Sequence, residues 1–279
     1  MDAFLNGRFV PEEEAVVPVT DRGFLYGDAL FETVRVCNRR PFRLAQHLER
    51  MTSGAEYLGL KLPFPPKELQ RSAAELIARY PANDAVLRVT LTRGSGERGY
   101  TPATEHTPTL LITLHPAPPL DPQQPARWSL ITSSYRLPAS DPLSAFKNGS
   151  KLLNVMARRE AAARQADEAL LLNANGEVAE AAGANLFWIY RDKVCTAPTG
   201  RGVLPGITRA VVLEICQTLQ LTTNKRVIKR ESLRECDAVF LTQSVLGLIE
   251  VVSLDGEPVP HSPLVEKLHQ AYCEMLARE

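Results

Sequence analysis

The sequence predicts a two-domain protein of the α/β (α+β) class. Its 279 residues are too many for one small core and suit two domains of moderate size. Segments with the two-residue period of strands alternate with segments that have helical spacing. Between two such sets lies HPAPPLDPQQPAR, residues 115–127, whose five prolines exclude a helix or a central strand. We therefore expect an N-terminal domain at 1–115, a proline-rich linker at 116–126 and a C-terminal domain at 127–279.

The N-terminal part is expected to combine helices with strands. Residues 44–58 and 66–79 carry apolar side chains at helical spacing. Residues 85–93 (AVLRVTLTR) alternate apolar and polar side chains, as a half-buried strand does, and residues 108–114 (PTLLITL) read as a second strand.

The C-terminal part repeats the alternation. A segment rich in Ala, Arg and Glu predicts a helix at 152–166. The dipeptide Asn175-Gly176 is typical of a hairpin turn and follows a predicted strand. The remaining expected elements are strands at 168–172, 185–190, 238–242 and 248–252, and helices at 208–219 and 263–278. We expect a mixed sheet in each domain.

Composition argues against several classes of function. Thirty-two basic residues balance thirty-two acidic ones, so no general field attracts nucleic acid or an anionic membrane. No apolar run reaches the roughly 18 residues that span a bilayer, and the first residues lack the pattern of a signal peptide. Five scattered cysteines and five scattered histidines suggest neither a disulfide framework nor a metal site. These features favour a cytoplasmic protein with reduced cysteines and no metal.

A glycine-rich motif, GSGERG at residues 94–99, matches the GxGxxG pattern of dinucleotide-binding folds and follows a predicted strand. That function requires a helix to begin at once, so that its N-terminus faces the pyrophosphate. The following residues, YTPAT, start a helix poorly. We therefore interpret the segment as a loop, with an arginine and a tyrosine near its tip, that could reach over a pocket.

The segment Phe146–Lys151 (FKNGSK) contains candidate nucleophiles. A lysine at the mouth of a pocket can attack an aldehyde when burial or nearby positive charge lowers its pKa. For any single lysine, a solvated surface position is the ordinary alternative. Local sequence leaves both Lys147 and Lys151 as candidates.

Three further segments could complete a site for pyridoxal 5′-phosphate (PLP). Glu180, among small residues before an apolar strand, suits a protonated pyridine nitrogen, although a turn carboxylate would look similar. The segment LPGITR, residues 204–209, opens a helix whose free amides and Thr208 hydroxyl suit a phosphate; alternatively, Thr208 only caps the helix. The segment LTQSV, residues 241–245, adds hydroxyl groups after a strand.

The order and spacing of these motifs resemble those of the class IV aminotransferases. This family includes branched-chain aminotransferases, D-amino-acid aminotransferases and 4-amino-4-deoxychorismate lyases. The resemblance begins at residues 19–33 (VTDRGFLYGDALFET) and continues through HLER at 47–50, the lysine segment, E-x-x-x-x-N-x-F from residue 180 and LPGITR. It implies a two-domain class IV aminotransferase (D-amino-acid aminotransferase-like) PLP fold.

The resemblance also implies residue roles. Lys147, rather than Lys151, would carry PLP as a Schiff base, and Glu180 would face the pyridine nitrogen. The phosphate would be bound by Arg50, Ile207, Thr208 and Ser244. On local sequence, Arg50 could equally be an exposed helical arginine. In the family the cofactor lies between the domains of a homodimer, and both subunits contribute to each site.

Substrate-binding residues distinguish the subgroups. Phe31 and Tyr100 stand where the D-amino-acid enzymes have a tyrosine and a histidine, whereas Arg98 keeps their arginine. Leu152 replaces a tyrosine of the branched-chain enzymes, and Ala29 replaces the usual glycine of the opening motif. The loop RGSGERGY, residues 93–100, is similar to that of the deoxychorismate lyases, as are ANLFW at 184–188 and FLTQSVLGLIEV at 240–251.

Two reactions share the same first step, in which Lys147 removes a proton from the carbon that bears the substrate nitrogen. A lyase would then eliminate pyruvate and give 4-aminobenzoate, an activity of folate biosynthesis, with Thr33 as a candidate proton donor. An aminotransferase would instead return the proton to the cofactor and release a keto acid. The three similar segments favour the lyase. A protein that binds PLP without turnover is disfavoured, because it would not need a base.

Overall fold

The computed structural model describes all 279 residues, and its contacts divide the chain into two units. Unit 1 comprises residues 1–118, 146–151 and 279; unit 2 comprises residues 119–145 and 152–278. The main division falls within the expected linker. The segment 146–151 differs from expectation, because it belongs to unit 1 and not to the C-terminal domain. Its backbone hydrogen bonds to an N-terminal strand, described below, are the physical reason.

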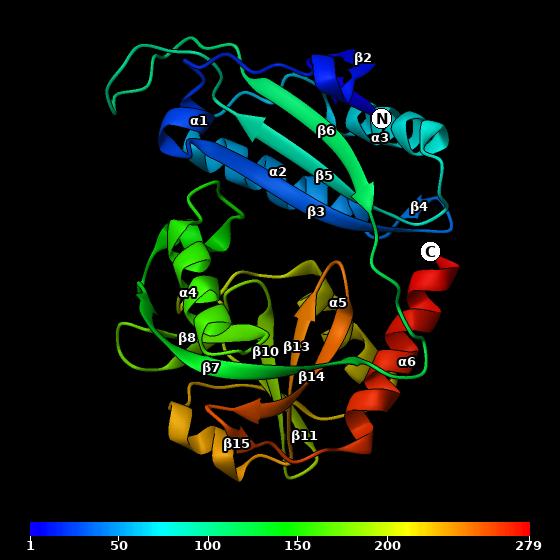
Figure 1. Cartoon of the computed structure of the whole chain (residues 1–279), viewed down its shortest axis with the longest axis vertical. Coiled ribbons are helices and arrows are strands. Elements are labelled where there is room, and N and C mark those ends of the chain that lie inside the picture. The colour runs from blue at the N-terminus through cyan, green and yellow to red at the C-terminus, as the bar shows by residue number, and fades with distance from the viewer. The chain divides into compact units, whose positions relative to one another are not determined.

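Unit 1 contains a six-stranded sheet with the order β2-β1-β6-β5-β3-β4 (Figure 1). All of its neighbouring strands are antiparallel, so the expectation of a mixed sheet is wrong for this unit. Short turns join β1 to β2 and β3 to β4, whereas helical segments separate β2 from β3 and β4 from β5. Even across these helical segments the paired strands run in opposite directions. Their bounds are β1 Asp2–Leu5, β2 Arg8–Pro11, β3 Ala29–Cys37, β4 Arg40–Pro41, β5 Ala85–Thr92 and β6 Thr109–Pro116.

Two helices cover one face of this sheet. Helices α2 (Leu44–Leu58) and α3 (Pro66–Arg79) have the predicted bounds, and α2 runs behind β3 and β5 in Figure 1. Their apolar sides pack against the alternate, inward-facing side chains of β3, β5 and β6. The short helix α1 (Arg22–Tyr26) precedes β3. The other face of the sheet therefore presents the polar half of the strand alternation.

Unit 2 contains a mixed sheet that closes on itself. The order runs β12-β11-β10-β13-β14-β7-β8-β9, and β9 pairs again with β10. This last pairing, between Glu180 and Asn185, closes a barrel of strands β10, β13, β14, β7, β8 and β9. The bounds are β7 Ala126–Leu137, β8 Glu168–Asn173, β9 Val178–Ala181, β10 Asn185–Tyr190, β11 Lys193–Thr196, β12 Thr223–Lys225, β13 Ala238–Gln243, β14 Gly247–Leu254 and β15 Glu257–Pro258.

Helices pack on the outside of this barrel (Figure 1). Helix α4 (Leu152–Ala163) packs on β7 and β8, α5 (Ile207–Thr218) on β13, and α6 (Pro263–Arg278) on β14. Short 3-10 helices η1 (Glu12–Glu14) in unit 1, and η2 (Pro142–Ala145) and η3 (Arg230–Glu235) in unit 2, complete the elements. Inside the barrel, buried side chains such as Trp188 form the core.

The glycine-rich motif lies in the connection between β5 and β6, residues 93–108, which contains no helix. The rejection of a dinucleotide-binding motif is thereby confirmed. None of the helices has the length and apolar character needed to cross a membrane.

Candidate active site

Lys147 lies on a segment that is fixed to the start of β3 by backbone hydrogen bonds. The Phe31 amide donates to the Lys147 carbonyl oxygen at 2.9 Å, and the Gly149 amide donates to the Ala29 carbonyl oxygen at 2.7 Å. The Lys147 Nζ atom lies 4.8 Å from the centroid of the Phe31 ring. The structure thus brings together the candidate nucleophile and a candidate substrate-binding residue.

Arg88 contacts the same aromatic ring, although the sequence did not single it out. Its Cζ atom lies 4.1 Å from the Phe31 centroid, and Thr33 is its register partner across β3 and β5. No carboxylate pairs with this half-buried guanidinium, and burial lowers the pKa of Arg88 below its usual value. In the sequence, Arg88 occupies a polar position of the alternating segment AVLRVTLTR. This alternation, which places Arg88 on the polar face of the strand, is the feature that could have pointed to it. Phe31, Thr33, Arg88 and Lys147 therefore form one cationic and aromatic cluster in unit 1.

Arg50 belongs to a buried network of hydrogen bonds around Glu32, a residue of β3. Its Nε and a terminal nitrogen donate to the two oxygens of Glu32 at 2.8 and 2.6 Å, and His47 Nδ1 lies 2.6 Å from Glu32 Oε2. Arg50 is therefore held in place by a bidentate ion pair and is not an exposed helical arginine. The planar guanidinium fork of Arg50 is of the kind that binds carboxylates and phosphates.

The network also sets protonation states. Burial raises the pKa of Glu32, but the hydrogen bonds from His47 and Arg50 outweigh it and hold that pKa below 4.5. Burial lowers the pKa of His47 below 6.5, against the opposing effect of Glu32; the charges of Arg50 and Lys147 lower it further. At neutral pH the network therefore holds an ionised Glu32 and a neutral His47.

Arg98 and Tyr100 lie on an exposed loop, apart from the Lys147 cluster. Tyr100 is 89% exposed and packs edge-on against Tyr26, with their ring centroids 5.6 Å apart. Buried Arg22 holds the loop by donating to the carbonyl oxygens of Glu97, Gly99 and Tyr100 at 3.3, 2.8 and 3.2 Å. Within unit 1 the structure does not bring Arg98 or Tyr100 into contact with Lys147 or Phe31.

Glu180 lies at the closure of the barrel in unit 2. Its Oε2 atom accepts from Asn185 Nδ2 at 3.0 Å and from the Leu204 amide at 2.9 Å. Two donors on one oxygen fix the position of the carboxylate. A carboxylate held in this way suits a protonated pyridine nitrogen as its partner.

Helix α5 begins at Ile207, directly after the Pro-Gly turn. Gly206 is its N-terminal cap, and no side chain caps the helix, so Thr208 does not act as the cap. The first helical bond runs from the Ala210 amide to the Gly206 carbonyl oxygen, at 3.0 Å. The preceding amides of Ile207 and Thr208 have no partner within the helix, as is general at helix starts, and they suit an anion.

Hydroxyl groups at the end of β13 add to this donor set. Ser244 lies in the turn after β13, and Thr242 lies opposite Asn185 in the barrel register. The Thr242 Oγ1 atom is buried and has no hydrogen-bond partner. A buried hydroxyl without a partner, the amides at the start of α5 and a fixed carboxylate are donor and acceptor types that fit the phosphate and the ring nitrogen of PLP.

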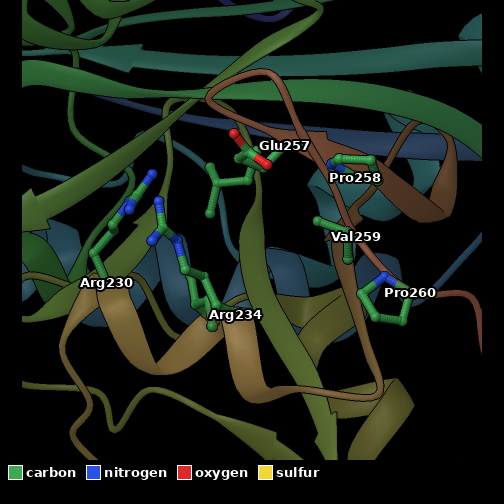
Figure 2. Close-up of a pocket in the computed structure, with 8 residues that line it drawn as sticks. Arg230, Arg234, Glu257, Pro258, Val259 and Pro260 are labelled. Carbon is green, nitrogen blue, oxygen red and sulfur yellow. The ribbon is translucent and has the colours of Figure 1, made fainter.

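A separate pocket of about 340 Å³ lies elsewhere in unit 2. It lies between η3 and the β14–β15 hairpin, and Figure 2 shows Arg230 and Arg234 extending into it side by side. Asp255 pairs with Arg230. None of the predicted site residues lines this pocket, and it offers no lysine or ionisable hydroxyl for the chemistry considered above.

Comparison with known proteins shows the family. The family model for amino-transferase class IV matches residues 29–254. A provisionally named branched-chain-amino-acid aminotransferase of Methanocaldococcus jannaschii is 31% identical over 95% of this chain and 92% of its own length. A D-alanine aminotransferase of Bacillus licheniformis is 29% identical over 93% of this chain and 90% of its own.

A solved structure from Legionella pneumophila, provisionally named a 4-amino-4-deoxychorismate lyase, superposes with a TM-score of 0.87 at 28% identity. The superposition covers 95% of this chain and 97% of the other. All three subgroups implied by the sequence motifs thus have members similar to this protein. The chain belongs to the class IV aminotransferase family, whose members are PLP-dependent enzymes.

Proposed function

We propose that the protein is a PLP-dependent 4-amino-4-deoxychorismate lyase, which releases pyruvate and leaves 4-aminobenzoate. The observation that carries this proposal is the cluster of Lys147 and Arg88 on the Phe31 ring. The substrate of that reaction carries two carboxylates and a six-membered ring. An arginine without a carboxylate partner, stacked beside an aromatic ring, suits such a substrate better than an aliphatic amino acid.

The residues of unit 1 would perform the proton transfers and bind the substrate. Lys147 would bind the cofactor aldehyde and, once the substrate amine displaces it, remove the proton from the carbon bearing nitrogen. Thr33, on the same strand face as Phe31, would donate the proton that the leaving group requires. Arg50 would bind the phosphate, and Arg88 a substrate carboxylate. Arg98 and Tyr100 would bind substrate from their loop.

The residues of unit 2 would hold the cofactor. The amides of Ile207 and Thr208, with the Thr208 and Ser244 hydroxyls, would bind the phosphate. Glu180 would pair with the pyridine nitrogen. When bound, PLP supplies an electron sink that stabilises the negative charge left by proton removal.

The second candidate is an aminotransferase. It is favoured by the curated relatives described above, which are named as branched-chain and D-alanine aminotransferases. Lys147 and Glu180 would serve in the same way, and Arg88 would bind a dicarboxylic keto acid equally well. The two functions therefore share the residues that bind the cofactor and remove the proton. They differ in the group to which that proton is then transferred.

We also propose that the protein is a cytoplasmic homodimer, with both subunits contributing to each site. Large apolar side chains are exposed on both units, among them Phe24 at 75%, Tyr100 at 89% and Leu152 at 74%. Exposure of this kind is typical of a subunit interface. A loop that carries Arg98 and Tyr100 without contacting Lys147 in its own unit also suits a role in a partner's site.

The test follows the absorbance of protein-bound PLP while single amines are added without a keto acid. The panel contains L- and D-amino acids and 4-amino-4-deoxychorismate. A lyase should release pyruvate from the last compound, keep its cofactor in the aldehyde form and give no change with the amino acids. Conversion of the cofactor to pyridoxamine 5′-phosphate by an amino acid, without pyruvate release from aminodeoxychorismate, would instead establish the aminotransferase.

A further inference from the structure

We infer that Asn185 is a positioning residue that couples the orientation of Glu180 to the start of α5. This inference deepens the proposed function and rests on PLP binding by the protein. Asn185 is 5% exposed and stands at the first position of β10. Its register partner, Glu180, forms the only β9–β10 pair, so the two residues close the barrel.

The side chain of Asn185 bridges two segments that are separate in sequence. Its Nδ2 atom donates to Glu180 Oε2 at 3.0 Å and to the Leu204 carbonyl oxygen at 2.9 Å. The Leu204 amide in turn donates to the same Glu180 oxygen at 2.9 Å. Glu180, Asn185 and Leu204 therefore form a closed set of three hydrogen bonds.

The start of α5 follows this set after two residues. Pro205 has a restricted φ, and Gly206 caps the helix. A Cβ atom on Gly206 would lie 2.0 Å from Asn185 Oδ1, so the turn packs directly on the amide. Any movement of the Asn185 side chain would thus shift both the carboxylate for the ring nitrogen and the amides for the phosphate.

The chain supplies a matched control in Asn173. This residue is fully buried on β8 of the same barrel, and its Nδ2 atom donates to Glu177 Oε2 at 2.8 Å and to the Arg201 carbonyl oxygen at 3.3 Å. Its Nδ2 atom thus bridges a carboxylate and a carbonyl oxygen as that of Asn185 does, and its Oδ1 atom also accepts from the Asn175 and Glu177 amides. None of its partners is among the proposed cofactor residues. Loss of Asn173 should therefore cost at least as much stability as loss of Asn185, whereas only the loss of Asn185 should weaken cofactor binding.

The experiment measures the dissociation constant of PLP, by absorbance, for the wild-type protein, Asn185→Ala, Asn185→Asp and Asn173→Ala. Thermal unfolding of each protein is recorded without added PLP. We expect Asn185→Ala to bind PLP at least tenfold more weakly than Asn173→Ala, although its loss of stability should be no greater. Asn185→Asp should bind as weakly at pH 8, because a carboxylate cannot donate to Glu180 and repels it. At pH 5.5 a proton shared by the two carboxyl groups should restore part of the affinity, relative to wild type.

Equal PLP affinity for the Asn185→Ala and Asn173→Ala variants would overturn the inference, as would an Asn185→Asp variant whose affinity follows pH as wild type does. A purely structural role would lower stability but would not create a proton-dependent rescue. Failure of the wild-type protein to bind PLP would be a different result, because it would overturn the proposed function and the inference together.

Discussion

At the scale of single residues, the buried Glu32 network is a source of pH-dependent stability. The folded pKa of His47 is depressed, chiefly by burial, so the native state resists the proton that the unfolded chain takes up. The contribution of His47 to the free energy of unfolding should therefore be fully present above about pH 6.5, and it should decline as the pH falls below that value. The slope for one proton is at most about 1.4 kcal/mol per pH unit. Glu32, whose pKa is also depressed, should add a further loss below about pH 4.5.

Urea unfolding at several pH values tests this expectation. The His47→Gln variant should lose stability less steeply than wild type between pH 6.5 and 5, because its side chain takes no proton in either state. Identical slopes for wild type and His47→Gln would show that His47 does not carry this dependence.

The sequence could identify those residues whose role is indicated by their position within a motif. Lys147 and Glu180 stand in motifs whose order is diagnostic, so they could be proposed without a structure. The contacts of Arg88 and Asn185 could not. Arg88 meets Phe31 across a strand pair, and Asn185 meets Leu204 across 19 residues of chain. Such partners depend on pairing register and barrel closure, which local sequence does not specify.

At the scale of elements, the loop of residues 93–108 depends on one arginine of α1. Arg22 donates to three loop carbonyl groups and also to Asp28. Lysine in its place would keep the charge but lose the planar fork. The Arg22→Lys variant should therefore raise the KM for substrate by about tenfold, the equivalent of about 1.4 kcal/mol, with kcat and bound PLP little changed.

Steady-state kinetics of Arg22→Lys and Arg93→Lys distinguish this effect from a general loss of stability. Arg93 also pairs with Asp28, but it donates to the carbonyl groups of Leu58 and Gly59 at the end of α2. Its replacement should lower stability with a smaller effect on KM. An equal rise of KM in both variants would argue against a specific role for the Arg22 contacts.

The elements themselves were largely predictable. Helices α2 and α3 have strong amphipathic patterns, and their predicted bounds are confirmed. Helix α4 ends at Ala163, three residues before its predicted end, and Gln165 adopts a positive φ of 56° just beyond it. Strand direction in unit 1 was not predictable in the same way, because it depends on which distant strands pair. The pairing of β1 with β6, for example, joins residues more than 100 positions apart.

At the scale of the whole molecule, the chain crosses between its two units more than once. It leaves unit 1 after residue 118, returns for residues 146–151 and continues in unit 2 from residue 152. The proline-rich segment marked the first crossing in sequence. No compositional change marks the return, because six residues that hydrogen-bond to β3 have no pattern of their own. The segment that carries Lys147 was consequently expected in the other domain.

The central claim of this account is that PLP is bound through Lys147. The most direct measurement treats the PLP-loaded protein with borohydride, digests it and locates the modified lysine by mass spectrometry, with Lys147→Ala as the control. We predict a phosphopyridoxyl group on Lys147, none on Lys151 and none on the variant. Modification of Lys151 or another lysine, or equal modification of the Lys147→Ala variant, would contradict the assignment.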